Sequence, residues 1–102
     1  MTMLHTVNKS PFEKNSLESC IRLVSEGSSI LLIEDGVYGA MKGTGKSGMV
    51  SDAMKKIKVY VLGADLSARG IAENQLIDGI NVVDYNGFVD LVAEHDSTQA
   101  WL

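Results

Sequence analysis

The feature that most constrains the fold is a run of four large aliphatic residues at 30–33, which is followed by Glu34, Asp35 and a glycine-rich segment. A short apolar run without alternation is typical of a strand buried on both faces, as in the centre of a parallel sheet covered by helices. In such sheets, ligands and partners bind at the loops that leave the carboxyl ends of the strands. The segment after residue 33 is therefore the first place to look for function.

Strands alternate with helices along the rest of the chain. Short runs rich in β-branched residues predict strands at 3–7, 29–33, 58–62 and 80–83. Helical spacing predicts helices at 15–26, 48–56 and 85–95, a short helix at 37–41, a helical turn at 63–70 and broken helix at 72–77. This alternation predicts one α/β domain over residues 1–102, a three-layer α/β/α sandwich with a mostly parallel sheet of four to five strands.

Several side chains have predicted places in these elements. Asn15 is a candidate N-cap whose capping box is completed by Glu18, and Asp65 is a candidate cap for the helical turn. The last helix is expected to turn some side chains inward (Phe88, Leu91, Val92) and others outward (Asp90, Glu94). A terminal Trp101-Leu102 is unusual for a free tail, so we expect an edge strand or a subunit contact there.

Composition excludes several classes of protein. With 45% hydrophobic and 22% charged residues, the chain is expected to fold rather than to be disordered. A net charge of −4 argues against a protein that holds nucleic acid by itself, because that affinity comes largely from Lys and Arg. The opening residues resemble no signal peptide, and the longest apolar run is too short to span a membrane. We therefore expect a cytoplasmic location, without direct contact to nucleic acid or membrane.

The loop from Gly43 to Ser47 resembles a phosphate-binding P-loop, which requires Gly-x-x-x-x-Gly-Lys-Ser/Thr directly after a strand. Here the first glycine is replaced by Ala40, and about six residues separate the strand from the loop. Gly43, Gly45 and Gly48 also match a dinucleotide fingerprint, but predicted helix precedes them. A flexible or partner-contacting loop is the favoured interpretation, and a stand-alone nucleotide-binding module is the alternative function.

Cys20 is the only thiol, so it cannot form an internal disulfide. Its spacing puts it on or beside the apolar stripe of the first helix, where a cysteine usually packs, whereas reactivity needs exposure and a lowered pKa. His5 and His95 suggest neither a triad nor a metal site, and no cofactor is expected. Asp65 and Arg69 have the i, i+4 spacing of a surface pair. Catalysis by this chain alone is not indicated.

Four segments together resemble the DsrH/TusB family of sulfur-relay proteins: MLHTVNKSPF, ILLIEDGVYGA, YVLGADLSARG and VVDYNGFVDLVAEHDSTQAWL. The resemblance covers nearly the whole chain. The sequence resembles the DsrH branch of sulfur-oxidising bacteria more closely than the TusB branch, which serves tRNA wobble-uridine 2-thiolation. It implies a small DsrEFH-like α/β domain.

The resemblance also implies partners. Family members assemble with DsrE/TusD-like and DsrF/TusC-like subunits into a dimer of heterotrimers, a heterohexamer that passes persulfide sulfur to a TusE/DsrC-like carrier. The principal sulfur-accepting cysteine belongs to the DsrE/TusD-like subunit. Cys20 matches a first-helix cysteine of the DsrH branch, so it is the candidate catalytic residue here, as an auxiliary persulfide acceptor. The implied role is that of a mainly structural subunit of a sulfurtransferase complex.

Overall fold

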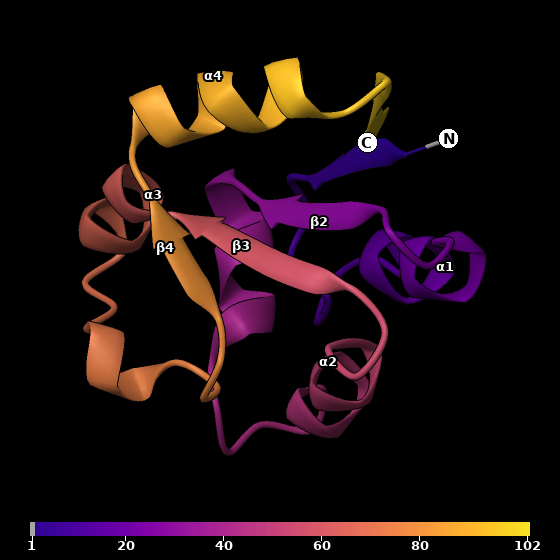
Figure 1. Ribbon diagram of the computed structural model, residues 1–102. Helices are drawn as coiled ribbons and strands as arrows, with labels where there is room; N and C mark the ends of the chain where they lie inside the picture. The colour runs from indigo at the N-terminus through magenta and orange to yellow at the C-terminus, as the bar shows by residue number, and fades with distance from the viewer. Residues whose placement is uncertain (1) are drawn as a thin grey trace.

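A single parallel sheet organises the computed structural model, which describes residues 2–102. Its strand order is β4-β3-β2-β1-β5, and every neighbouring pair is parallel (Figure 1). The strands are β1 (Met3–Val7), β2 (Ser29–Leu32), β3 (Lys58–Leu62), β4 (Asn81–Val83) and β5 (Ser97–Trp101). The four strands predicted at 3–7, 29–33, 58–62 and 80–83 are confirmed, and their observed ends differ from the predicted ends by at most one residue. The C-terminal residues form the fifth strand at one edge of the sheet. Of the two expectations for this segment, an edge strand or a subunit contact, the edge strand is confirmed.

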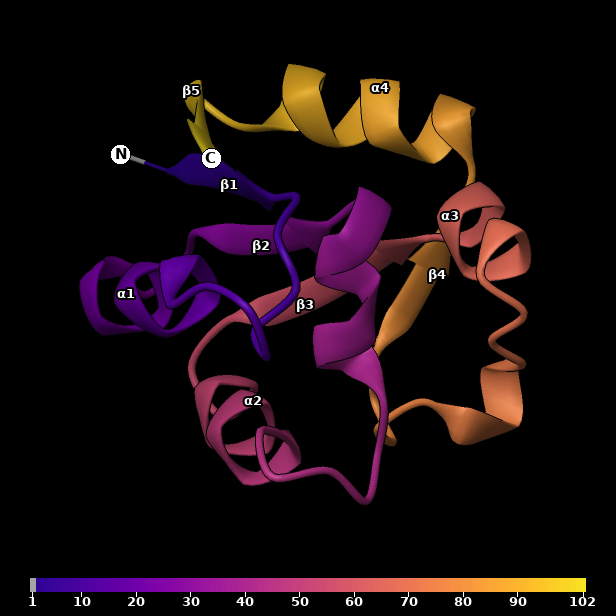
Figure 2. The ribbon, with the colours of Figure 1, turned by 180° about the vertical axis from the view of Figure 1, so that it is seen from behind.

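Helices cover both faces of the sheet, which confirms the three-layer sandwich (Figures 1 and 2). The α-helices are α1 (Ser16–Leu23), α2 (Ser47–Ala53), α3 (Gly63–Ala68) and α4 (Tyr85–Glu94). Two 3-10 helices, η1 (Glu34–Ala40) and η2 (Glu73–Gln75), lie in the connections. Within residues 2–102, α4 alone covers one face, and α1, α2, α3 and η1 contribute to the cover of the other.

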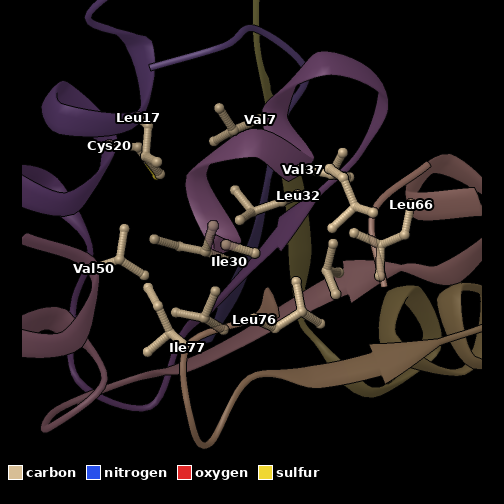
Figure 3. Close-up of a cluster of buried hydrophobic side chains, with 14 of the residues drawn as sticks. Val7, Leu17, Cys20, Ile30, Leu32, Val37, Val50, Leu66, Leu76 and Ile77 are labelled. Atoms are coloured by element: carbon tan, nitrogen blue, oxygen red, sulfur yellow. The ribbon is translucent and has the colours of Figure 1, made fainter. Parts of the chain in front are cut away.

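The central strand β2 is buried along its whole length, as the apolar run predicted. Ile30 and Leu32 face the larger cluster, which also contains Leu17 and Val50 from the covering helices (Figure 3). Leu31 faces the opposite way and packs in a smaller cluster under α4. Side chains on successive strand residues point to opposite faces, so one apolar run supplies both cores.

The first helix is shorter than predicted. α1 ends at Leu23, and Val24 leaves it in an extended conformation that packs against the larger cluster. Asn15 is the N-cap residue by position, but its side chain makes no capping hydrogen bond, so the capping box with Glu18 was a wrong prediction. Glu18 pairs instead with Arg22, one turn further on, at 3.6 Å.

The last helix α4 has a narrow inward stripe. Leu91 is buried, and Phe88 packs beside it against the sheet, as predicted. Val92 was expected to point inward, but its side chain is 43% exposed. It is one helical step, about 100°, beyond Leu91, and so it turns past the sheet. Tyr85 and Val89 are exposed as well, so the outward face of this helix is partly apolar.

Two connections also differ from their predictions. The short helix expected at 37–41 is the 3-10 helix η1, which begins at Glu34 and thus follows β2 almost directly. Its Gly36 passes so close to the end of β1 that a β-carbon there would overlap the carbonyl oxygen of Val7. In the segment 72–77, only Glu73–Gln75 are helical.

We expect Gly36→Ala to lower the free energy of unfolding by about 3 kcal/mol, because backbone atoms cannot move aside as a flexible side chain can. Gly45→Ala is the matched control, since a β-carbon there would meet no atom of the described residues 2–102 within 4 Å. That variant is expected to stay within about 0.5 kcal/mol of the wild type. Urea unfolding followed by circular dichroism measures both values, and equal stability of the two variants would contradict the close approach.

Candidate functional site

A charged cluster lies at the carboxyl ends of β2 and β3, the edge at which the sequence directed the search. Arg69, at the end of α3, donates from Nε to Oδ1 of Asp35 at 2.9 Å, and its Nη2 lies 2.9 Å from the same oxygen. Nη1 of Arg69 donates to the backbone oxygen of Asp65 at 3.2 Å and lies 3.9 Å from the Asp65 carboxylate. The predicted Asp65–Arg69 pair is therefore formed, but Asp35 is the closer partner of Arg69.

Asp65 also joins two connections of the fold. Its Oδ2 accepts a hydrogen bond from the backbone N–H of Glu34 at 2.7 Å, at the start of η1. The N-cap of α3 is Leu62, so the prediction that Asp65 caps its own helix was wrong. Glu34 has φ of +49°, a left-handed conformation that is uncommon outside glycine, and the bond from Asp65 helps to hold it. The cluster thus fixes the shape of this edge and leaves the Asp35 side chain 55% exposed.

Cys20 lies on the buried side of α1, in the larger hydrophobic cluster beside Leu17 (Figure 3). The prediction that it sits on the apolar stripe is confirmed, and its exposed fraction is 0%. Burial raises the pKa of the Cys20 thiol to about 12, because the apolar surroundings disfavour the thiolate. The nearest cation along the helix, Arg22, is an exposed residue paired with Glu18. In this structure the Cys20 thiol is out of reach of solvent, and its surroundings favour the neutral thiol over the thiolate.

The two histidines have separate structural partners. Nδ1 of His5 accepts a hydrogen bond from the indole Nε1–H of Trp101 at 3.0 Å, and this bond ties β5 to β1. His95 lies just after α4, with Nδ1 2.7 Å from the Leu91 oxygen and Nε2 3.0 Å from Oγ of Ser29. Residues 2–102 contain no cluster of three or more His, Cys, Asp or Glu side chains placed to hold a metal ion.

The glycine-rich loop does not have the placement of a P-loop. The whole of η1 separates it from β2, whereas a P-loop directly follows its strand. The loop closes on itself, since Oγ of Ser47 donates to the Thr44 oxygen at 2.8 Å and the Lys46 N–H donates to Oγ1 of Thr44 at 3.2 Å. The arrangement is that of a surface turn leading into α2. Within residues 2–102, no helix has the length and apolar character needed to cross a membrane.

Sequence reasoning missed two of these contacts. Asp35 was noted only as part of the polar segment that follows residue 33, and its pairing with Arg69 joins residues 34 positions apart. His5 and Trp101 are 96 positions apart. No local pattern signals either pair, because both depend on which strands become neighbours in the sheet.

Comparisons with known proteins agree with this architecture. Residues 9–98 match the family described as "DsrH like protein". Protein TusB of Shigella flexneri and Protein TusB of Escherichia coli K12 are each 40% identical over 99 residues, which cover 97% of this chain and 100% of theirs.

Solved structures show the same fold. The ychN protein from E. coli superposes with a TM-score of 0.86 at 17% identity, covering 98% of both chains. Protein MTH1491 from Methanobacterium thermoautotrophicum superposes with a TM-score of 0.76 at 20% identity, covering 97% of this chain and 96% of its own. At these identities the likeness is one of fold.

We expect Cys20 to react with iodoacetamide at least about a hundredfold more slowly in the folded chain than in urea, because the reactive species is the thiolate and burial suppresses it. Mass spectrometry over time at pH 8 measures the two rates, with Cys20→Ala as the control for labelling at other side chains. Equal rates of Cys20 alkylation in the folded and the unfolded chain would contradict the burial of the thiol.

Stability is expected to depend on the protonation of His5, because burial lowers the pKa of its imidazole below the usual 6.5. As the pH falls through 6.5, the unfolded chain takes up a proton that the folded chain does not, so unfolding becomes easier. We expect the midpoint temperature of thermal unfolding to be lower at about pH 5.5 than at about pH 7.5. The variant His5→Gln is expected to remove most of this difference. The pKa of Asp96 is also lowered, chiefly by a hydrogen bond from the Thr2 backbone. Protonation of Asp96 changes the stability only near and below pH 3.8, outside the range compared here. A midpoint that rises on acidification in this range would contradict the assignment.

Proposed function

Because the chain belongs to the DsrH-like family, we propose that it is a subunit of a sulfur-relay complex that passes persulfide sulfur to a TusE/DsrC-like carrier. Its partners in this proposal are one DsrE/TusD-like and one DsrF/TusC-like subunit, arranged as a dimer of heterotrimers. The 40% identity to proteins named TusB along their whole length supports this assignment. The proposed place of action is the cytoplasm.

In this complex the chain acts mainly as a structural subunit. The observation that carries this part of the proposal is the burial of Cys20, since it is the only cysteine in the sequence. A sulfur acceptor must reach the donor persulfide as a thiolate, and in the folded chain Cys20 is both enclosed and protonated. At the carboxyl ends of β2 and β3, Asp35 and Asp65 are each paired with Arg69.

The alternative within the same complex is that Cys20 is an auxiliary persulfide acceptor. Its thiolate would attack the outer sulfur of a partner's persulfide, and the partner's thiolate would leave as the old S–S bond breaks and the new one forms. The exchange needs no external oxidant or reductant. It does need α1 to move away from the sheet, because Leu17 and Cys20 are packed together in the larger cluster.

Two pathways fit such a complex. The relatives named TusB favour tRNA wobble-uridine 2-thiolation, which is the role of the TusB branch. The presence of Cys20 favours sulfur oxidation, which is the role of the DsrH branch. The genes next to the one that encodes this chain distinguish the two pathways. Dissimilatory sulfite reductase genes there would indicate sulfur oxidation, and their absence would favour tRNA thiolation.

The proposal is tested by producing the chain together with the two partner subunits from the same genome, loading the complex with a persulfide donor, and measuring the intact mass of every subunit. We expect one stable complex in which the DsrE/TusD-like subunit gains sulfur, this chain gains none, and Cys20→Ser leaves the transfer rate to the carrier unchanged. The matched control is the same mixture without this chain, which is expected to lose the transfer.

Two outcomes would overturn the proposal in different ways. If the chain fails to join the other subunits, it is no part of a complex of this kind. If the chain gains one sulfur atom that Cys20→Ser abolishes, it is a sulfur carrier and the mainly structural role is wrong.

A further inference from the structure

A cavity of about 430 Å³ opens at the amino ends of β2 and β3, away from the charged cluster of Asp35 and Arg69 at their carboxyl ends. The segments that enter the two strands meet there, and the end of α4 lies on the same side of the molecule (Figure 1). The lining consists of residues 27–29, 54–58 and 94–95 together with Thr2 and Tyr60. The proposed subunit role assigns no part to these residues.

The charge of the cavity is opposite to that of the chain. The sequence has 13 acidic residues against 9 lysines and arginines, which gives a net charge of −4. Among the described residues that line the cavity, three are lysines (Lys55, Lys56 and Lys58) and one, Glu94, is acidic. With His95 neutral, three lysines against one glutamate leave the lining with a net charge of +2. A concave surface lined mainly by one sign of charge attracts ligands of the opposite sign.

The register of the sheet determines where Lys58 stands. Lys58 is paired with Ser29 of β2, and the next residue, Val59, packs in the larger cluster on the α1 side. Successive side chains of a strand point to opposite faces, so Lys58 and Tyr60 both lie on the α4 side. Tyr60 indeed packs against the smaller cluster under α4. One face of β3 thus presents an ammonium group and a phenol side by side at the cavity.

Hydrogen bonds fix the wall next to Lys58. Nδ1 of His95 lies 2.7 Å from the Leu91 oxygen, and because a carbonyl oxygen can only accept, Nδ1 carries the proton. Nε2 of the neutral ring then accepts a hydrogen bond from the Ser29 hydroxyl at 3.0 Å. These bonds hold the end of α4 against β2. The wall is therefore formed before a ligand binds, which lowers the cost of binding.

The end of a helix accounts for only part of this charge. Lys55 and Lys56 follow α2, and the carbonyl groups at a helix C-terminus attract cations. Lys55 also lies 3.4 Å from Asp52, but both side chains are 77% exposed, and such a surface pair is weak. Lys58 belongs to a strand, and within residues 2–102 neither Lys56 nor Lys58 forms an ion pair. At least these two ammonium groups are left for a ligand.

The charge and the size of the cavity indicate one class of ligand. A phosphate monoester carries about 1.5 to 2 negative charges at pH 7 and three acceptor oxygens, and lysine binds such a group as a compact positive charge. The volume of about 430 Å³ is that of a site for a small organic ligand, and Met54, Ile57 and Tyr60 give the lining an apolar part. A nucleic acid fits less well, because the net charge of −4 would repel an extended polyanion.

We propose that this cavity binds a small organic phosphate, with the phosphate group against Lys56 and Lys58 and the organic part beside Tyr60. The site goes beyond the subunit role and does not depend on it. A bound phosphate would neutralise the charge at this end of the sheet. It would also connect the end of α4 with the segment that enters β3, since both line the cavity.

The test is a titration of the full chain with phenyl phosphate, followed in two-dimensional NMR spectra of the backbone amides. The signals of residues 27–29, 55–58 and 94–95 are expected to shift with one dissociation constant, whereas those of 63–67 are not. We expect Lys56→Ala and Lys58→Ala each to weaken binding by about tenfold, because each removes a charge-assisted hydrogen bond. Lys42→Ala is the matched control, since Lys42 is exposed and lies outside the lining, and it is expected to bind as the wild type does.

Inorganic phosphate and phenol test the two halves of the ligand separately. Each is expected to bind at least about tenfold more weakly than phenyl phosphate, because each lacks one set of contacts. If the signals around the cavity do not shift, or if Lys42→Ala weakens binding as much as Lys58→Ala, the proposal is wrong. If inorganic phosphate binds as tightly as phenyl phosphate, the assignment of an organic ligand is wrong. These results leave the subunit assignment untouched, because the intact-mass experiment tests it independently.

Discussion

The burial of β2 on both faces is the constraint on which the rest of the structure depends. All four of its residues are enclosed, so the sheet needs a cover on each side. The larger cover includes α1, α2, α3 and η1, and within residues 2–102 the smaller one is α4 alone. Removing apolar surface from water is the main favourable term in folding, and this strand supplies it to two cores at once. Parallel strands need crossover connections, and in this chain those connections supply the helices that cover the two faces.

The same packing decides the chemistry available to Cys20. Leu17 and Cys20 lie on the side of α1 that faces the sheet, so the helix cannot cover Ile30 without enclosing the thiol. An apolar environment favours the neutral thiol, which is why the pKa of Cys20 rises to about 12. A buried thiol contributes to packing as a small apolar side chain does. In this chain the cysteine is part of the core that holds the sheet.

The fold was predictable from the sequence to the extent that local patterns determine it. Apolar runs located β1, β2, β3 and β4, and alternation with helical spacing predicted the layers. Helix ends were less predictable: Val24 has helical spacing, but it leaves α1 in an extended conformation and packs against the core from there. Val92 was misplaced for a related reason, since α4 contacts the sheet along a narrow stripe and has no second layer above it.

Contacts between distant residues determine the site, and no local pattern contains them. The pairing of Arg69 with Asp35 depends on η1 starting directly at the end of β2, beside α3. The bond between Trp101 and His5 depends on β5 returning to the side of β1. That return places an uncharged strand at the edge of the sheet, and a terminal Trp-Leu that was unusual for a free tail gains an explanation. The indole anchors β5 to β1. Strand β5 therefore completes the sheet through its pairing with β1, and the long-range pair of Trp101 and His5 fixes that register.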